Sequence, residues 1–234
     1  MKTVPSVLIT GANRGLGLEW ARQYAEADWR VLASCRRPEE AADLKALAGR
    51  HPQVSVHRLD VTDSEQLRTL QLDLEEAGID VLLNNAGVYL DKFMGDLGGI
   101  DYEVWLRSFA VNTLGAVRVS EAFIGQLARS AQKRVVVISS HMGSIAEIAE
   151  PGSYAYRSSK AALNAAMKGL SHALAHRGIG VLLLHPGWVK TRMGGPDATL
   201  TPEESVHAMR ALVENFKPKM NGRFFRYDGS EIPW

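Results

Sequence analysis

The sequence predicts an α/β fold in which one doubly wound parallel sheet of about seven strands carries helices on both faces. Short apolar runs alternate with longer segments of helical pattern along almost the whole chain. Several of these runs are continuously apolar, as strands covered on both faces require. A glycine-rich turn stands where the first run must pass into the first helix. Strand–helix alternation at this spacing implies right-handed crossovers and a parallel sheet.

The apolar runs have the length of strands, and the segments between them have the length of helices. We expect strands at residues 7–10, 31–33, 54–56, 81–83, 135–138 and 181–184, with a further edge strand at Phe224-Phe225. We expect helices near residues 15–27, 38–48, 63–77, 101–129, 153–177 and 202–217. Asp63 and Thr201 are the expected N-caps, while Pro38 and Pro202 suit first helical turns.

The composition is that of a single globular domain spanning residues 1–234. The chain is 46% hydrophobic and 23% charged, and its net charge of +1 provides no field for nucleic acid or an anionic membrane. No apolar run has the length that crosses a bilayer, and the N-terminal residues lack the pattern of a signal peptide. Cys35 is the single cysteine, so an internal disulfide is excluded. We therefore expect a cytoplasmic protein.

The turn after the first strand, residues 10–17, has the composition of a nucleotide-binding loop. Gly11, Gly15 and Gly17 permit a tight turn and let the backbone approach a pyrophosphate at a helix N-terminus. Their spacing, G-x-x-x-G-x-G, differs from the G-x-G-x-x-G of the dinucleotide fingerprint. A glycine-rich turn is often only a turn, but its place after the first strand favours nucleotide binding. The sequence thus predicts a Rossmann-type domain.

The end of the second strand indicates which nicotinamide cofactor binds. An acidic residue there would bond the adenosine ribose and select NAD, but Ser34 and Cys35 occupy this position. Arg36 follows, and Arg14 lies in the glycine-rich turn. A guanidinium meets phosphate oxygens in a bidentate fork, so these residues suit a 2′-phosphate. Alternatively, Arg36 and Arg37 are a pair of solvated side chains at the start of a helix. The combination of Arg36 with Arg14, and the missing acidic residue, favours NADP(H) over NAD(H).

Small and polar residues also end the later strands, and ligands in open α/β sheets bind at such carboxyl ends. These segments are Asp60-Val61, Asn84-Asn85-Ala86-Gly87, Ser139-Ser140 and Pro186-Gly187. Each segment could simply close its strand, but together they predict a ligand site along one edge of the sheet. Asn112 lies within a long helical segment, where Asn is a poor helix former and is either functional or exposed.

Tyr156 and Lys160 are one helical turn apart, within about 40° of one helix face. A Tyr hydroxyl has a reference pKa of about 10, and a nearby ammonium stabilises the phenolate. A Ser hydroxyl from another element, such as Ser140, would hold a substrate oxygen while the tyrosine passes it a proton. An ordinary amphipathic helix is the alternative, because a Tyr-x-x-x-Lys spacing is common by chance.

In their order along the chain, these motifs resemble the short-chain dehydrogenase/reductase family. The resemblance rests on the glycine-rich turn, residues 84–87, Asn112, Ser140, Tyr156-x-x-x-Lys160 and Pro186-Gly187, and it covers nearly the whole chain. The run 154–160 and the tail 227–234 are similar to the C-factor and sniffer group of carbonyl reductases.

The resemblance implies that Tyr156 donates a proton, that Lys160 lowers the pKa of Tyr156 and bonds the nicotinamide ribose, and that Ser140 binds the substrate oxygen. It implies that Asn112 holds a relay water and that Thr191 holds the nicotinamide carboxamide. The implied cofactor contacts are Gly11, Asn13, Arg14, Gly15, Leu16, Gly17, Arg36, Asp60, Val61, Asn85, Ala86, Gly87, Tyr156, Lys160, Pro186, Gly187, Val189 and Thr191. In the family the serine usually lies nearer the tyrosine than Ser140 does, so Ser144 is a rival.

These expectations describe an NADPH-dependent oxidoreductase that reduces the carbonyl of a ketone, aldehyde or quinone to the alcohol. One alternative is a steroid or 3-oxoacyl thioester reductase. Another is an NADP(H)-binding signalling or regulatory protein with incidental catalysis. We expect no metal, because none of the histidines has a metal-ligand spacing with a carboxylate or cysteine partner. His141 and His185 adjoin the predicted site and are candidates to line its cleft.

Two further expectations concern assembly and the substrate pocket. Ala162, Ala166, Gly169 and Ala173 either permit close approach of a second helix or face the sheet, and the resemblance implies a homodimer. Apolar residues that follow two strand ends predict an apolar pocket; they are Tyr89, Leu90, Phe93, Met94, Trp188 and Met193. Residues 188–201 are the expected substrate lid, and Lys190 and Arg192 are the charged exceptions within it.

Overall fold

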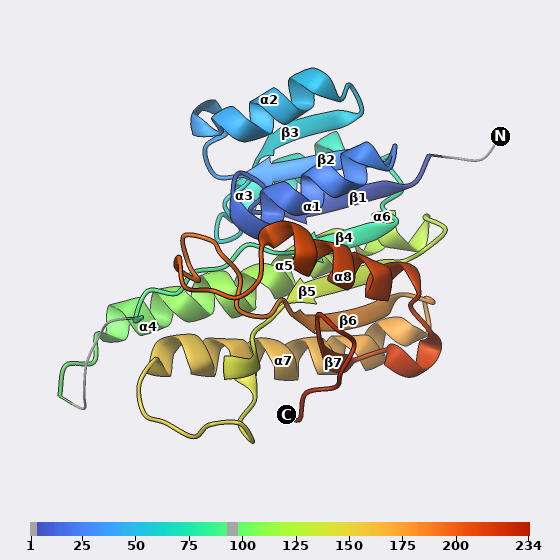
Figure 1. Ribbon diagram of the computed structural model, residues 1–234. Helices are drawn as coiled ribbons and strands as arrows, with labels where there is room; N and C mark the ends of the chain where they lie inside the picture. The colour runs from blue at the N-terminus through green and yellow to red at the C-terminus, as the bar shows by residue number, and fades with distance from the viewer. Residues whose placement is uncertain (1–3, 93–97) are drawn as a thin grey trace.

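The computed structural model describes residues 4–92 and 98–234, which form one seven-stranded parallel sheet between two layers of helices (Figure 1). Phe93 and Met94 of the predicted pocket lie outside the described residues. The strands are β1 (Ser6–Thr10), β2 (Arg30–Cys35), β3 (Val54–Arg58), β4 (Val81–Asn84), β5 (Arg134–Ile138), β6 (Gly180–His185) and β7 (Arg223–Arg226). The longer helices are α1 (Gly15–Glu26), α2 (Ala42–Arg50), α3 (Ser64–Asp73), α4 (Tyr102–Phe109), α5 (Ala116–Ala122), α6 (Ile124–Ala128), α7 (Tyr154–Ala175) and α8 (Pro202–Glu214).

The strand order is β3-β2-β1-β4-β5-β6-β7, and every neighbouring pair is parallel. The chain moves outward from β1 to β3 and then returns to β4 on the other side of β1. This reversal creates a crevice between the carboxyl ends of β1 and β4, which is where open α/β sheets bind ligands. The predicted fold class is therefore confirmed, including the edge strand at Phe224-Phe225.

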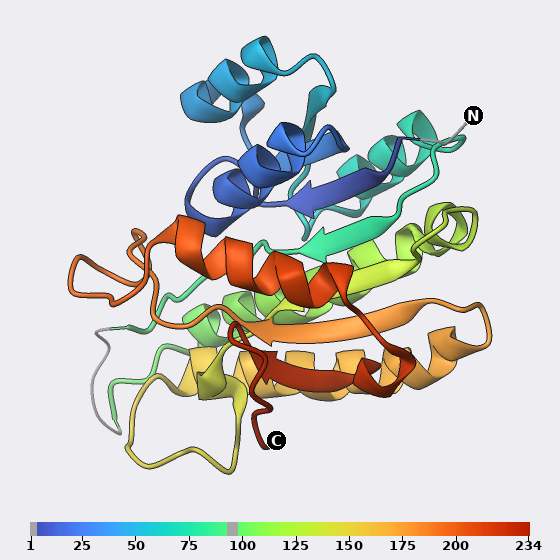
Figure 2. The same ribbon diagram turned by 45° about the vertical axis from the view of Figure 1, so that its right-hand side comes forward.

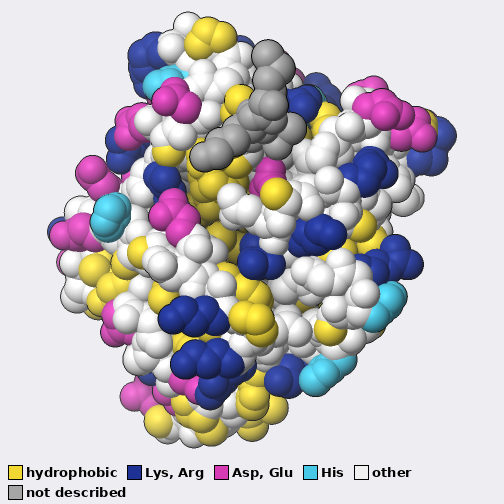
Figure 3. Space-filling model, turned by 90° about the vertical axis from the view of Figure 1, so that its right-hand side faces the viewer, with side chains coloured by type: hydrophobic (Ala, Val, Ile, Leu, Met, Phe, Trp, Pro, Cys, Tyr) yellow, Lys and Arg dark blue, Asp and Glu magenta, His cyan; other side chains and the backbone are white. Residues whose placement is uncertain are grey.

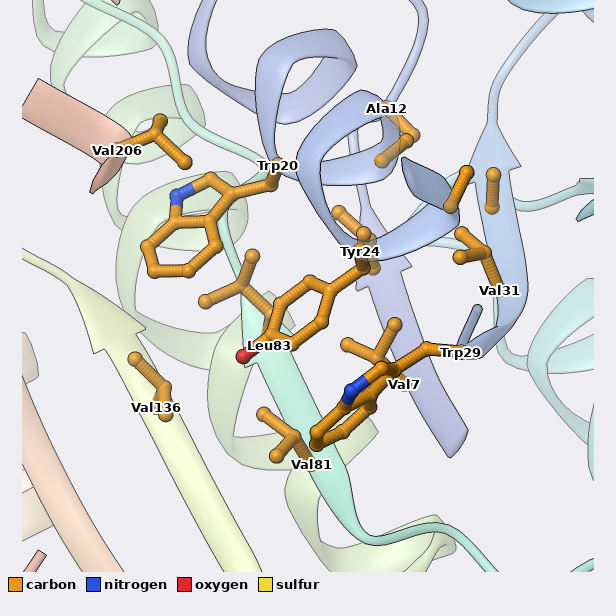
Figure 4. Close-up of a cluster of buried hydrophobic side chains, with 14 of the residues drawn as sticks. Val7, Ala12, Trp20, Tyr24, Trp29, Val31, Val81, Leu83, Val136 and Val206 are labelled. Carbon is orange, nitrogen blue, oxygen red and sulfur yellow. The ribbon is translucent and has the colours of Figure 1, made fainter. Parts of the chain in front are cut away.

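One face of the sheet is covered by α1, α2 and α8 (Figure 2). Trp20 and Tyr24 of α1 are buried there, with stacked rings whose centroids are 5.7 Å apart. Figure 4 shows these rings above strand residues such as Leu83 and Val136, with Val206 of α8 beside Trp20. Burying large aromatic and aliphatic side chains is the main stabilising contribution to such a layer.

The opposite face is covered by α3, α5, α6 and α7, whose apolar residues pack on Leu8, Leu82 and Val137 of the central strands. Leu163 and Met167 are the α7 residues at the centre of this layer. Both faces of the sheet are thus buried, which explains why the strands are continuous apolar runs. Tyr156 and Lys160 lie on the same helix as Leu163 and are held in place by this packing.

Two of the predicted helices differ from the structure. Pro38 begins a short 3-10 helix, Pro38–Glu40, and α2 starts only at Ala42. The segment expected as one helix over 101–129 is divided into α4, a π-helical segment Ala110–Gly115, α5 and α6. A π segment widens the helix by one residue per turn and is frequent at functional sites. Asn112 is in this segment.

Helix caps follow the sequence closely. The Asp63 carboxylate accepts hydrogen bonds from the N–H groups of Glu65 and Gln66, and Thr201 forms a capping box with Glu204. Pro202 occupies the first turn of α8. Side-chain oxygens at N-caps satisfy backbone N–H groups that have no partner within the helix. The two expected N-caps are therefore confirmed.

The face at the amino ends of the strands lies opposite the predicted site. It carries acidic and basic side chains together, with apolar side chains between them (Figure 3). Within the part of the chain that the structure describes, no helix has the length and apolar character needed to cross a bilayer.

Candidate active site

The glycine-rich turn joins β1 to α1 at the carboxyl edge of the sheet. Gly11 has a φ of 68° and Gly15 a φ of 53°, in the left-handed region that favours glycine. A Cβ at Gly17 would collide with the carbonyl oxygen of Gly11. The turn is therefore compact because three of its positions require or strongly favour glycine, and Asn13 and Leu16 lie within it.

The first turn of α1 retains its free N–H groups. Arg14, at its N-cap position, makes no capping hydrogen bond with a described side chain, and the first turn contains no acidic residue. In contrast, α3 and α8 are capped by Asp63 and Thr201. Unpaired N–H groups at a helix N-terminus attract anions.

The basic residues near this turn differ in what they contact. Arg14 and Arg36 are exposed, and among the described residues neither forms an ion pair. Arg37 instead pairs with Glu40, with a nitrogen–oxygen distance of 2.7 Å. Arg36 and Arg14 therefore remain candidates for a 2′-phosphate, whereas Arg37 has a local partner.

Asn85 and Thr10 join the end of β4 to the glycine-rich turn. The Asn85 amide donates to the carbonyl oxygens of Thr10 (2.9 Å) and Gly11 (3.1 Å). The Thr10 hydroxyl accepts from the N–H groups of Asn85 (3.1 Å) and Ala86 (3.0 Å). Thr10 was not among the predicted contact residues, although it begins the glycine-rich motif. These bonds fix the crevice between β1 and β4.

Asp60 and Val61 follow β3 at the same edge of the sheet. The Asp60 carboxylate accepts hydrogen bonds from the backbone N–H (2.9 Å) and the hydroxyl (2.7 Å) of Thr62. Val61 is buried and packs against Gly115, where a Cβ would collide with it. Both residues thus have structural contacts of their own, in addition to their place along the predicted adenine-binding edge.

Tyr156 lies in the first turn of α7 and is almost completely buried, with 6% of its surface exposed. The side chain of Ser140, at the end of β5, lies near enough to this hydroxyl to lower its pKa. Burial raises the pKa of Tyr156 to about 12, and Ser140 opposes this rise. The direction is opposite to the one expected from a neighbouring ammonium, because removing the hydroxyl from water disfavours the phenolate more strongly.

Lys160 is buried one turn further along α7. Its Nζ donates to the carbonyl oxygen of Ile138 (2.9 Å) and lies 5.9 Å from the centroid of the Tyr156 ring. Burial lowers the pKa of Lys160 to about 8. A Cβ at Gly87 would lie 3.6 Å from this Nζ, so the end of β4 and the lysine face each other.

Asn112 is 1% exposed, which excludes the alternative of an exposed helix residue. Its Oδ1 accepts from the N–H of Val88 (2.8 Å), while its Nδ2 donates to Val88 O (2.9 Å) and to the hydroxyl of Ser159 (2.9 Å). The π segment therefore brings this amide between the chain that follows β4 and helix α7.

The structure distinguishes the two candidate serines by position. Ser140 lowers the pKa of Tyr156, and its Oγ accepts from the N–H of Met142 (3.2 Å). Ser144 is fully buried, and its Oγ accepts from the N–H of Glu147 (3.3 Å). Ser140 is thus the serine that the fold places beside the tyrosine.

Two residues of the segment after β4 contact the start of helix α7 directly. The ring of Tyr89 is stacked on that of Tyr156, and the carboxylate of Asp91 accepts from the N–H groups of Ala155 and Tyr156. Asp91 was missed by the sequence reasoning. Its only signal there is a carboxylate soon after the strand-end motif, and nothing in the sequence indicates a partner 64 residues away.

The segment after β6 brings one of its predicted contact residues, Thr191, to the glycine-rich turn. Gly187 has a φ of 81°, and Pro186 O accepts from the hydroxyl of Ser205 (2.6 Å). Val189 is buried, and a Cβ at Gly15 would lie 3.4 Å from the Thr191 methyl carbon. The predicted lid therefore begins near the glycine-rich turn.

Hydrogen bonds of side chains connect residues within the predicted lid segment, 188–201. The Trp188 Nε1 donates to Gly194 O (2.8 Å), and the N–H of Gly194 donates to the Thr191 hydroxyl (3.1 Å). The Lys92 Nζ donates to Met193 O (2.8 Å), which connects the lid with the segment after β4.

His141 and His185 contact each other at the ends of β5 and β6, with ring centroids 4.8 Å apart. Burial, and then His141, lower the pKa of His185 to about 3, so this ring is neutral at physiological pH. Among the residues that the structure describes, no group of His, Cys, Asp and Glu is arranged to hold a metal ion.

Comparison with known proteins agrees with this arrangement. The family model for short chain dehydrogenase matches residues 5–199. C-signal of Myxococcus xanthus is 47% identical over 156 residues, covering 67% of this chain and 93% of that protein. The structure of carbonyl reductase Sniffer of D. melanogaster is similar with a TM-score of 0.94 at 32% identity, covering 99% of this chain and 100% of that chain.

The NADPH-bound carbonyl reductase from chicken fatty liver is similar with a TM-score of 0.90 and 33% identity, and 99% of each chain is covered. Both solved structures match this chain over nearly their whole length. Their sequence identities of 32% and 33% indicate a common family as well as a common fold. The chain therefore belongs to the short-chain dehydrogenase/reductase family of oxidoreductases.

Proposed function

We propose that the chain is an NADPH-dependent reductase that converts the carbonyl of a ketone, aldehyde or quinone to the alcohol, with Tyr156 as the proton donor. The observation that carries the proposal is the buried Tyr156 hydroxyl, in contact with Ser140 and one turn from Lys160. Lys160 lies near Gly87, in the segment after β4 whose residues Asn85 and Ala86 bond Thr10 of the glycine-rich motif. The similarity to an NADPH-bound carbonyl reductase supports the same cofactor here.

The residues present fit a dinucleotide phosphate. The uncapped N-terminus of α1 offers N–H donors to the pyrophosphate, and the glycine positions allow the backbone to approach it. Arg14 and Arg36 are exposed and available for the 2′-phosphate. Thr191, beside Gly15, suits the carboxamide end. When bound, NADPH supplies the hydride for the carbonyl carbon.

The proton comes from the protein. A tyrosine with a pKa of about 12 bears its proton at neutral pH and can donate it to the carbonyl oxygen as negative charge develops there. Ser140 holds the same oxygen. Lys160, whose pKa is about 8, still bears a charge at neutral pH that stabilises the resulting phenolate. Burial of all three groups strengthens these interactions.

Asn112 has a more restricted part in the proton relay. The side-chain amide of Asn112 already donates to Val88 O and to the Ser159 hydroxyl. A relay water at this residue would therefore act as the donor, to an oxygen of Asn112. A Cβ at Gly87 would lie 3.3 Å from the Asn112 Oδ1 and 3.6 Å from the Lys160 Nζ. A water near Gly87 would therefore reach both residues.

The substrate side of the site is apolar. Ile145, Ile148, Trp188 and Met193 are exposed, on two segments that leave the same edge of the sheet (Figure 2). Lys190 contributes, after Thr201, to the lowered pKa of Glu204, so its charge acts toward the start of α8. Apolar and aromatic carbonyls are therefore favoured over small keto acids. A steroid or a 3-oxoacyl thioester is an alternative of the same chemistry.

The experiment that tests the proposal is NADPH oxidation against a panel of aryl aldehydes, quinones, steroids, 3-oxoacyl thioesters and 2-keto acids. We expect the highest kcat/KM for an aryl aldehyde or a quinone. A clear preference for a keto acid would contradict the apolar pocket. The similarity to C-signal keeps a signalling function as the second candidate. Tight NADPH binding with no turnover across the panel would favour it.

We also propose a homodimer, formed through α4, α5 and α7. Tyr102 and Leu106 lie one turn apart on α4 with 69% and 64% of their surfaces exposed. On α7, Gly169 and Ala173 are exposed, whereas the sheet-facing positions are occupied by larger side chains such as Met167. Gly169 and Ala173 thus face away from the sheet. Exposed apolar side chains on α4 and exposed small residues on α7 suit the packing of two helix pairs.

A further inference from the structure

The carboxylate of Asp91 is placed at the start of the helix that carries Tyr156. It accepts a hydrogen bond from the N–H of Ala155 (2.8 Å) through Oδ2, and from the N–H of Tyr156 through both oxygens (3.2 and 3.3 Å). Asp91 is only 7% exposed. A buried carboxylate requires such partners, because an unpaired one would be strongly destabilising.

These bonds do for α7 what an N-cap does for other helices. Ser153 occupies the N-cap position, but it has a φ of 52° and makes no capping hydrogen bond with a described residue. The free N–H groups at the start of this 22-residue helix are satisfied instead by an acid from the segment after β4. A negative charge there also offsets the positive end of the helix dipole.

The segment that carries Asp91 is itself fixed at two points. Asn112 bonds both the N–H and the carbonyl of Val88. The Tyr89 ring stacks on Tyr156 with centroids 4.2 Å apart, and its hydroxyl bonds that of Ser153 (2.5 Å). Asp91 is therefore held in its position relative to Tyr156 by contacts on both sides.

We propose that Asp91 is a positioning residue for the reaction, which caps the helix of Tyr156 and keeps the Tyr156 hydroxyl in its proton-bearing form. The inference rests on the proposed function. A carboxylate near a phenolate disfavours it, and neutralising the helix terminus removes a second source of stabilisation for the phenolate. Burial is the main cause of the raised pKa of Tyr156; among the described residues, Tyr89 and Asp91 raise it further, and Lys160 is a nearby cation.

Asp91→Asn tests the charge, because it keeps an acceptor oxygen but removes the negative charge. The rate of alcohol oxidation, measured with NADP and a simple aryl alcohol, rises with pH as Tyr156 ionises. We expect the midpoint of this rise to move to lower pH by roughly 0.5–1 unit in the variant. Asp101→Asn is the matched control, since Asp101 caps α4 through the N–H of Val104 (3.1 Å). A midpoint that is the same in wild type and Asp91→Asn would overturn the charge effect.

Asp91→Ala tests the cap, because it removes the acceptors as well. We expect faster hydrogen exchange at the amides of residues 154–160, a more than tenfold lower kcat, and an unchanged Kd for NADPH. Unchanged exchange at these amides would overturn the capping role. The exchange measurement needs no turnover, so it remains decisive even if the carbonyl panel shows that the proposed reaction is wrong. If Asp91→Ala does not fold, exchange in Asp91→Asn is compared with that in Asp101→Asn.

Discussion

The ring of Tyr89 lies nearly parallel to the ring of Tyr156, with centroids 4.2 Å apart and an interplanar angle of 17°. The contact holds Tyr156, the proposed proton donor, from the side of the segment after β4. An aromatic pair of this kind contributes about 0.5–1.5 kcal/mol beyond the area it buries. Tyr156 therefore has three restraints from outside its own helix, through Tyr89, Asp91 and Ser140.

Replacement of Tyr89 separates its ring from its hydroxyl. Tyr89→Phe keeps the stacked ring and loses only the bond with Ser153, so we expect a kcat within about threefold of wild type. Tyr89→Ala loses the ring as well, and we expect kcat to fall about tenfold or more because the Tyr156 ring becomes free to move. The measurement is kcat for the best aldehyde at saturating NADPH. Equal effects of the two variants would show that the stacking is unimportant.

Tyr156→Phe removes the proton donor and little else. We expect turnover to fall by about two or more orders of magnitude, which is the contribution of a general acid. The Kd for NADPH should stay near that of wild type. Tyr154→Phe, two residues earlier in the same helix turn, is the control and should keep most of its activity. A Tyr156→Phe enzyme that retains most of its turnover would rule out the assignment.

Lys160 makes the free energy of unfolding depend on pH. Its pKa is about 8 in the folded chain, below the value of about 10.4 expected in an unfolded one. Between these values the unfolded chain binds more protons, so stability rises with pH from about 8 to about 10. Relative to Lys160→Met, wild type should gain about 1–3 kcal/mol across this window, measured by urea unfolding. Lys168→Met is the control on the same helix. Parallel curves for wild type and Lys160→Met would contradict the shift.

Arg36 and Arg37 are adjacent, which gives cofactor choice a matched test. Arg36→Ala should weaken NADPH binding about 10- to 100-fold and leave NADH binding nearly unchanged, because a charge-assisted contact with the 2′-phosphate is lost. Arg37→Ala is the control, since Arg37 pairs with Glu40. Kd values from fluorescence titration decide the matter. Equal affinity of wild type for NADPH and NADH would show that no such phosphate contact exists.

The proposed dimer is tested at the exposed face of α4. Leu106→Lys places a charge in the proposed interface and should give a monomer mass by light scattering at micromolar concentration, where wild type gives a dimer. Ile145→Lys is the control, because Ile145 is exposed to a similar extent but lies on the substrate side. A monomeric wild type would rule out the assembly.

The sequence alone predicted the strands, most helices and the turn that joins β1 to α1. These features depend on local chemistry, because a continuous apolar run suits a strand covered on both faces and Gly11 suits a left-handed backbone. The same holds for the caps at Asp63 and Thr201, whose partners are within three residues. The rule that parallel strands end at one edge placed Ser140 at the ligand-binding edge, whereas its pairing with Tyr156 was an expectation from the family resemblance.

The sequence did not predict what depends on distant packing. The π segment around Asn112, the contact of Asp91 with the start of α7 and the stacking of Tyr89 on Tyr156 join parts of the chain that are 24 to 67 residues apart. Burial, and with it the raised pKa of Tyr156, is likewise a property of the assembled layers. A sequence pattern reports the preferences of neighbouring residues, whereas the dielectric around a hydroxyl and the partner of a helix terminus are determined only when the sheet and its loops have come together.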